Sequence, residues 1–397
     1  MQNKIKILGL DVSKSSVSAC LLESKPAQVR QFYYEYQFLK FNANRAGITA
    51  MLALNADIAV IEPTGTNYSL IWAEHLRRAG VDVLSVGHKE LRNYRANHLA
   101  LPDKDDDADA LALACYWFDY CGDTTRFVDN RCGIIRHIRR LILRLGHLNR
   151  VQSPIVNRLR QDLAWQFPEV ALSKSQPGKL GVAPLWLWLA GETQSVRYNA
   201  MYQNSIGLGI GDEVRFHAQR LCSLQREERL IESELQQLLS DTRFTVYTEA
   251  FNKFGFGLRL QAMIMSQIYP VEFFLKDGKP EVQIRKGRKS GKPTKRYISL
   301  RKFQKCLGLA PSLESSGDKH QSKVNSGSKL CRKAFWQWVF TRLEVKRSRL
   351  NNEIYTTLCE FLDTEKTLGK PIRLVRSRVA SKAVKLLFRE LVKPIKD

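Results

Sequence analysis

Four carboxylates in the first part of the chain have the residue types and spacing needed for metal-assisted chemistry. Asp11 ends one apolar, β-branched run and Glu62 ends another, so each is predicted to lie at the end of a strand. Asp106 and Asp109 open a predicted helix, and their i, i+3 spacing puts both on one helical face. Neighbouring strand ends meet at one edge of a sheet, which is where open α/β sheets place their sites.

An acidic cluster at a helix N-terminus is by itself well explained by capping and solvation. Four converging carboxylates are a different case, because they raise one another's pKa values unless cations compensate their charge. Two divalent ions balance four negative charges, and Mg²⁺ or Mn²⁺ suits oxygen ligands. A pair of such ions can clamp the attacking and leaving oxygens of a phosphoryl transfer. The set therefore predicts a metal-dependent phosphoryl-transfer site.

Positioning these acids requires a sheet with helices packed on it. Residues 1–125 alternate strand-like and helix-like stretches, and we expect three consecutive antiparallel strands followed by alternating helices and buried strands. The order βββαβαβα predicts a mixed sheet. The predicted strands are 4–13, 17–23, 31–39, 57–63 and 81–87, and the predicted helices are 44–54, 66–79 and one beginning near 106.

The remainder of the chain is predicted to be mainly helical. Residues 126–250 form a helical linker in which 213–239 carry a leucine-rich stripe, typical of a coiled-coil arm or of a helix packed on its own domain. Residues 251–350 form a third domain with a basic insert at 276–300, and 351–397 form a basic tail. The stretch 276–305 holds twelve Lys or Arg against two acids and is predicted to be an exposed loop or hairpin.

Composition favours a nucleic-acid partner. The net charge is +24, and nucleic acid is the commonest acidic partner of so basic a chain, an anionic membrane surface being the competing explanation. No apolar run approaches the roughly 18 residues of a spanning helix. None of the eight cysteines forms a CxxC pair, so a zinc site is not indicated, and scattered thiols fit a reducing cytoplasm.

Three motifs carry a family resemblance. GLDVSK at 9–14, IEPTG at 61–65 and KDDDADA at 104–110 resemble those of the DEDD transposases of the insertion sequence 110 family, which includes the Piv-type DNA invertases. The resemblance implies an α/β N-terminal domain of ribonuclease-H-like, RuvC-like fold. It also implies metal ligands at Asp11, Glu62, Asp106 and Asp109. Members act on donor and target DNA, assemble as dimers or tetramers and are guided by a structured RNA, the bridge RNA.

The second half adds further resemblances. FNKFGFGLRLQAMIMSQI at 251–268 is similar to the family's second-domain signature, with Gly255 and Gly257 in a turn before a helix. FQKCLGLAPSLESSGDK at 303–319, followed by NSGSKLCRKAF at 325–335, resembles the block that holds the family's serine nucleophile. The matching position is Ser316, and Ser315 is the adjacent alternative.

Three other functions remain compatible with the sequence. A RuvC-like Holliday-junction nuclease would use the carboxylates and water without serine chemistry. An ATP-dependent kinase of the actin-like class would use GLDVSKSSVSACLL as its phosphate-binding turn. A non-enzymatic nucleic-acid-binding scaffold would need only the charge, but it leaves the placement of Asp11 and Glu62 at strand ends unexplained.

Overall fold

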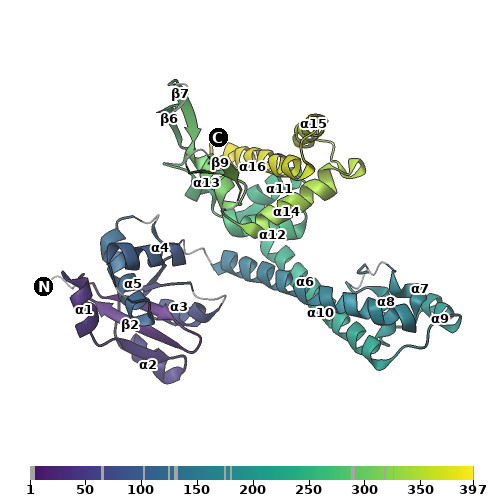
Figure 1. The fold of residues 1–397 in the computed structure, drawn as a ribbon, viewed down its shortest axis with the longest axis horizontal. Coiled ribbons are helices and arrows are strands. Elements are labelled where there is room, and N and C mark those ends of the chain that lie inside the picture. The colour runs from purple at the N-terminus through teal and green to yellow at the C-terminus, as the bar shows by residue number, and fades with distance from the viewer. Residues whose placement is uncertain are drawn as a thin grey trace. The chain divides into compact units, whose positions relative to one another are not determined.

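The chain divides into two compact units, unit 1 (Met1–Arg131) and unit 2 (Cys132–Asp397), in a computed structural model (Figure 1). No helix among the described residues combines the length and the apolar character needed to cross a bilayer. The structure describes residues 5–63, 67–101, 103–123, 126–128, 133–173, 176–178, 181–287, 291–316, 319–324 and 326–396.

Unit 1 is built on a mixed five-stranded sheet, as the sequence predicts. The strand order is β3-β2-β1-β4-β5, in which β1 pairs antiparallel with β2 and parallel with β4. The β2–β3 pair is antiparallel and the β4–β5 pair is parallel. The strands are β1 (Ile7–Val12), β2 (Ser16–Leu22), β3 (Leu39–Asn42), β4 (Ile58–Ile61) and β5 (Asp82–Ser85).

Helices cover both faces of this sheet because side chains alternate along its central strand. Leu8 and Leu10 of β1 pack with α2 (Arg45–Leu52) and α3 (Tyr68–Arg78) in one apolar core. Ile7 packs on the opposite face in a second core, which contains the helices α4 and α5 and partly buried aromatic residues of α1. The elements of this second layer are α1 (Val29–Glu35), α4 (His88–Asn93), the π-helix η1 (Tyr94–His98) and α5 (Asp106–Tyr120).

The strand predicted over 31–39 is wrong. Residues 29–35 form the helix α1, and the third strand begins only at Leu39. Phe32 and Tyr36, four residues apart, stack with ring centroids 4.8 Å apart, and Tyr36 also meets Phe38 edge to face. The aromatic side chains thus cover the sheet from a helix, because four-residue spacing brings them together on one helical face.

Unit 2 contains a long antiparallel helix pair that runs through two separate apolar cores. The first half of α6 (Gly133–Gln166) and the last part of α10 (Asp212–Leu239) belong to the larger core. Their other ends pack with α7 (Pro168–Ala171), α8 (Pro184–Leu189) and α9 (Val196–Gln203) in a smaller one. The predicted stripe on α10 is buried inside this unit, because Leu221, Ile231 and Leu235 lie within these cores.

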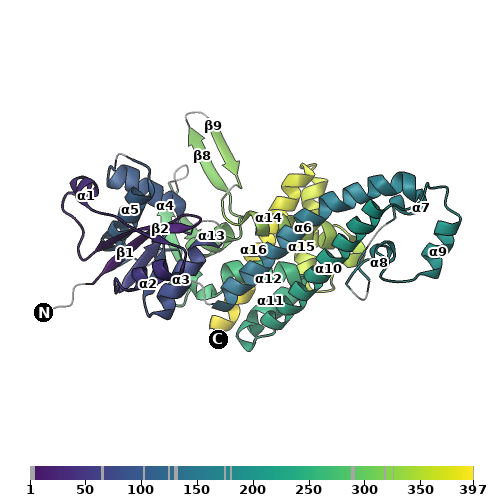
Figure 2. The same ribbon diagram turned by 90° about the horizontal axis from the view of Figure 1, so that it is seen from below.

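The larger core is completed by C-terminal helices and carries two hairpins (Figures 1 and 2). The basic stretch forms the β6–β7 hairpin and then α13, in agreement with the predicted hairpin. The elements of unit 2 that follow α10 are η3 (Thr242–Phe244), α11 (Thr245–Lys253), α12 (Leu258–Ile268), η4 (Val271–Phe274), β6 (Val282–Lys286), β7 (Pro293–Tyr297), α13 (Ile298–Cys306), β8 (Ser312–Ser316), β9 (Lys319–Lys323), α14 (Lys329–Trp338), η5 (Val339–Leu343), η6 (Lys346–Ser348), α15 (Glu353–Thr367) and α16 (Ile372–Lys396).

Candidate active site

The close approach of β1 and α5 places the acidic start of α5 over the sheet. A Cβ atom added to Gly9 would lie 2.1 Å from the carbonyl oxygen of Ala110 and 2.6 Å from the amide nitrogen of Ala114. Only glycine fits at this crossing, and the alanines of α5 allow the helix to lie close against the strand. Asp11 follows two residues later on the same face of β1, so it points towards the beginning of α5.

Glu62 is brought beside Asp11 by the parallel pairing of β1 and β4. The register pairs Gly9 with Val60 and Leu10 with Ile61, so Asp11 and Glu62 come next at the carboxyl ends of the two strands. Adjacent strands lie about 4.8 Å apart, and the two side chains share a face of the sheet. On the other side of β1, Asp11 is opposite the buried hydroxyl residue Ser18 of β2.

The four predicted carboxylates interact electrostatically at this edge. Burial, then the charges of Asp109, Asp106 and Glu62, and last a hydrogen bond with Asp106, together raise the pKa of Asp11 from 3.8 to about 7. The pKa of Asp109 is also raised, mainly by burial. A carboxylic acid in such surroundings loses its proton at a higher pH than usual, and nearby positive charge favours its ionised form.

The neighbouring acids of the same segment have other contacts. Asp105 is the N-cap of α5, accepting a hydrogen bond from the Ala108 amide, and it also accepts one from the Tyr33 hydroxyl. Asp107 has a buried Oδ1 atom, with no hydrogen-bond partner in the described part of the chain. Within 105–109, therefore, Asp106 and Asp109 are the acids whose charges act on Asp11.

Two basic side chains that the sequence did not single out contact this cluster. Arg95 is buried, lies on the π-helix η1 and donates from Nη1 to Asp109 Oδ1 over 2.7 Å. His88, the first residue of α4, contacts Glu62 through Nδ1. A π-helical turn frequently marks a functional position, but hydrophobic periodicity in HKELRNYRANH gives no sign of it. Only the close spacing of basic residues just before the acidic segment could have directed attention to them.

The donor set fits a hard divalent cation in its chemistry, because all four groups offer carboxylate oxygens. In the described part of the structure, no three His, Cys, Asp or Glu side chains already surround a single point as ligands. Arg95 contacts Asp109 and His88 contacts Glu62, so two of the four carboxylates already have basic partners.

The second predicted constellation lies in unit 2. Gly255 has a positive φ of 57°, and a Cβ atom there would meet the Tyr355 hydroxyl at 2.8 Å, so this glycine has a structural role in packing α11 against α15. Gly257 is the N-cap of α12, and a Cβ atom there would meet nothing within 4 Å. Gly255 is therefore required by the conformation of the turn, whereas the space next to Gly257 is open.

Ser316 is the last residue of β8, paired with Lys319 of β9. The side chains of Ser315, Ser316 and the lysines of β9 lie outside the described residues. Arg332 of α14 donates to the carbonyl oxygens of Val324 and Ser326, so it holds the chain that follows β9.

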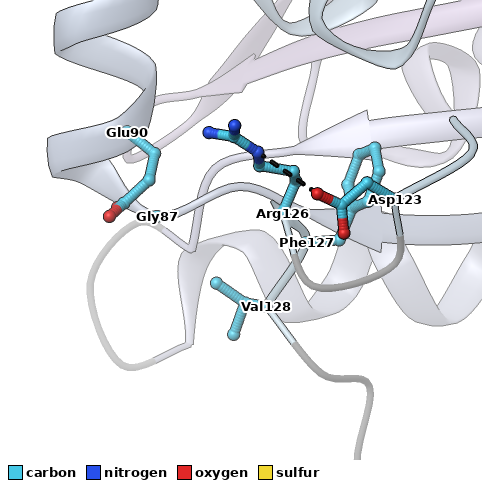
Figure 3. A pocket seen from close by; sticks show the side chains of 6 residues that line it. All are labelled: Gly87, Glu90, Asp123, Arg126, Phe127 and Val128. Carbon is cyan, nitrogen blue, oxygen red and sulfur yellow. Dashed lines mark ion pairs between the residues drawn. The ribbon is translucent and has the colours of Figure 1, made fainter. Parts of the chain in front are cut away.

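A separate pocket lies beside the start of α4 (Figure 3). It is lined by Gly87, Glu90, Asp123, Arg126, Phe127 and Val128. Asp123 and Arg126 form an ion pair of 3.5 Å across it. The two carboxylates of this pocket, with one already paired, are a poorer match for metal-assisted chemistry than the cluster at Asp11.

Comparison with known proteins identifies the class. Residues 290–354, from the β6–β7 turn through β8, β9 and α14 to the start of α15, match the transposase IS116/IS110/IS902 family. This match confirms the family that the sequence motifs indicated, and it supports an IS110-family transposase. No curated protein matches the sequence.

The solved structures that are similar to part of the chain include two of RuvC. The Thermus thermophilus RuvC structure is 14% identical, covering 31% of this chain and 98% of its own, with a TM-score of 0.22. T. thermophilus RuvC in complex with a Holliday junction substrate is 12% identical, covering 31% and 99%, also with a TM-score of 0.22.

Proposed function

We propose that this chain is a DNA transposase or site-specific recombinase that moves an insertion sequence, with its carboxylate site in a RuvC-like, ribonuclease-H-like unit 1. The observation that carries the proposal is that burial and the charges of Asp109, Asp106 and Glu62 together raise the pKa of Asp11 at one sheet edge. A chain that used these acids only for solubility would gain nothing from burying Asp11 among three others. The transposase match at 290–354 supports the same function from the other unit.

The four carboxylates are proposed to hold Mg²⁺ or Mn²⁺. Such ions, when bound, polarise a phosphodiester and stabilise the charge that develops on its oxygens. The chain's own contribution is to fix the carboxylates on the rigid β1, β4 and α5 elements. Arg95 balances part of the negative charge at Asp109, and His88 contacts Glu62.

Ser316 is proposed as the nucleophile of strand exchange. Its hydroxyl would lose its proton and form an ester bond to phosphorus, while the DNA oxygen on the other side of that phosphorus leaves and takes up a proton. The reverse attack by a second strand's hydroxyl would restore the serine and join new DNA partners. The number of phosphoester bonds is conserved at each step, so no external energy source is needed.

The proposed partners are donor and target DNA, a structured guide RNA and further copies of the chain, as a homodimer or homotetramer. The family resemblance supports the RNA and the assembly, and the net charge of +24 fits phosphate-rich partners. A defined RNA that co-purifies with the full chain would support the guide, and its absence under conditions where DNA is recombined would exclude it.

The experiment is to trap recombination on a plasmid carrying the gene and its flanking DNA, and to look for protein joined to a strand end. Ser316→Ala should abolish both the adduct and recombination while DNA binding persists, and the matched variant Ser315→Ala should retain both. Asp11→Asn should abolish both without unfolding the chain. If both serine variants cleave DNA normally and no adduct forms, the hydrolytic RuvC-like nuclease replaces this proposal.

A further inference from the structure

The β6–β7 hairpin is a two-stranded ribbon that extends away from the helices of unit 2 (Figure 1). Its strands, Val282–Lys286 and Pro293–Tyr297, pair with each other and form a sheet of their own. Eight of these ten residues are exposed, including Ile284 at 69% and Tyr297 at 55%. An isolated two-stranded ribbon is marginally stable in water, so one with both faces exposed has surface available for a partner.

The positive charge of the ribbon indicates that its partner is an anion. Residues 282–297 contain seven Lys or Arg and no Asp or Glu. Two such ribbons from different copies of the chain would repel each other, which disfavours homotypic strand pairing. A polyanion is the complementary partner, because each phosphate contact releases a counterion from nucleic acid.

The strand register sorts the side chains into two faces. Gln283 pairs with Arg296 and Arg285 with Thr294, so one face carries only hydrogen-bonding side chains. The opposite face carries Val282, Ile284, Lys286, Pro293, Lys295 and Tyr297.

Two side chains of the hydrogen-bonding face are held in place by hydrogen bonds. Arg285 donates to the side-chain oxygen of Gln283 over 2.9 Å, and Gln283 donates to Glu281 over 2.6 Å. Arg, Gln and Thr are side chains that read base edges, Arg against guanine and Gln against adenine.

We propose that the β6–β7 ribbon enters the major groove of duplex DNA, with the face of Gln283, Arg285 and Arg296 against the base edges. This inference rests on the proposed function in that DNA is the substrate. The major groove is about 12 Å wide and admits a two-stranded β-ribbon. The major groove of A-form RNA is deep and too narrow for side chains to read, so duplex RNA is a poor alternative occupant.

The test uses the full chain and dimethyl sulfate probing of a 30-base-pair duplex. This reagent methylates guanine N7 in the major groove and adenine N3 in the minor groove. Arg285→Ala/Arg296→Ala removes two cations from the ribbon. Lys346→Ala/Arg347→Ala removes the same formal charge from exposed residues of η6 and is the matched control. Because the ribbon faces are exposed, both variants should keep the thermal unfolding midpoint of the unmodified chain.

The unmodified chain and the η6 variant should protect guanine N7, and the ribbon variant should lose that protection. The ribbon variant should also bind the duplex at least about tenfold more weakly, since each base-edge contact is expected to contribute that much. Binding is measured without catalysis, so these outcomes do not depend on the carboxylates or on Ser316.

Guanine N7 protection that persists in the ribbon variant would overturn the proposal. Equal weakening by the η6 variant would also overturn it, because the effect would then reflect net charge alone. Tighter binding to duplex RNA than to duplex DNA, or a ribbon variant that changes only the oligomeric state, would assign the surface to a different partner.

Discussion

Replacing Asp11 with asparagine should stabilise the metal-free protein while it abolishes activity. The folded state raises the pKa of the Asp11 carboxyl from 3.8 to about 7, chiefly by burial and then by three neighbouring charges. The folded state therefore holds this proton more tightly than the unfolded chain does. Between pH 4 and 7 the unmodified protein loses stability as pH rises, and above pH 7 the penalty is complete. Asparagine carries no charge at any of these pH values.

The size of the effect follows from the same shift. A rise from 3.8 to about 7 corresponds to about 4 kcal/mol at 1.36 kcal/mol per pKa unit. Because Asp11 is only partly buried, solvent screening reduces the expected gain to about 2 kcal/mol at pH 8. Near pH 4.5 the gain should shrink to a few tenths of a kcal/mol, since most of the penalty has not yet developed.

Hydrogen exchange of the β1 and β4 amides measures the change in stability around Asp11. A local measurement is needed because a chain of two units does not unfold in one step. In EDTA at pH 8, Asp11→Asn should exchange about 30-fold more slowly than the unmodified chain, the equivalent of 2 kcal/mol. Asp82→Asn, at the exposed start of β5 in the same sheet, should show no difference. Adding Mg²⁺ should slow exchange in the unmodified chain and have little effect on Asp11→Asn.

Faster or unchanged exchange in Asp11→Asn at pH 8, or a difference that does not diminish towards pH 4.5, would refute the carboxylate cluster around Asp11. The result would then favour an ordinary solvated acid at the strand end. Loss of recombination without the gain in protection would support a role in DNA contact in place of ion binding.

The other predictions concern the supports of the site. Gly9→Ala should destabilise unit 1 by about 3 kcal/mol and reduce the slowing of hydrogen exchange by Mg²⁺, because the new Cβ meets the α5 backbone at 2.1 Å. Gly146→Ala in α6 is the control, because a Cβ atom there would meet nothing within 4 Å, and it should be neutral or stabilising in the same exchange assay. Arg95→Gln should destabilise the metal-free protein by about 3 kcal/mol, because it leaves the carboxylate of Asp109 half-buried without its cation. Mg²⁺ titration followed by thermal unfolding should recover part of that loss, and no recovery would argue against an ion at Asp109.

The strands that carry the site could be predicted because burial on both faces leaves a strong signal. ILGL and IAVI are short runs without polar side chains, each followed directly by an acid, and the structure places those acids at adjacent strand ends. The prediction of a strand over QFYYEYQFL was wrong for a physical reason. Its aromatic residues satisfy both alternation and four-residue spacing, and only packing against the rest of the sheet decides between strand and helix.

Arg95 could not have been found by the same reasoning. Its importance comes from a π-helical turn that aims a buried guanidinium at Asp109, and no periodic pattern encodes that turn. The role of Gly9 was equally hidden, since a single glycine in an apolar run gives no indication of the helix that will cross it.

The α6–α10 pair has a mechanical consequence. An α-helix resists bending because its hydrogen bonds run along its axis, so α6 can act as a stiff lever between the two cores of unit 2. Pro154 lies between Leu148, anchored in the larger core, and Leu159, anchored in the smaller one. Proline has no amide hydrogen to donate to the preceding turn, so the resistance to bending is lowest there. If the α7–α9 end moved, α6 would therefore bend most easily at Pro154.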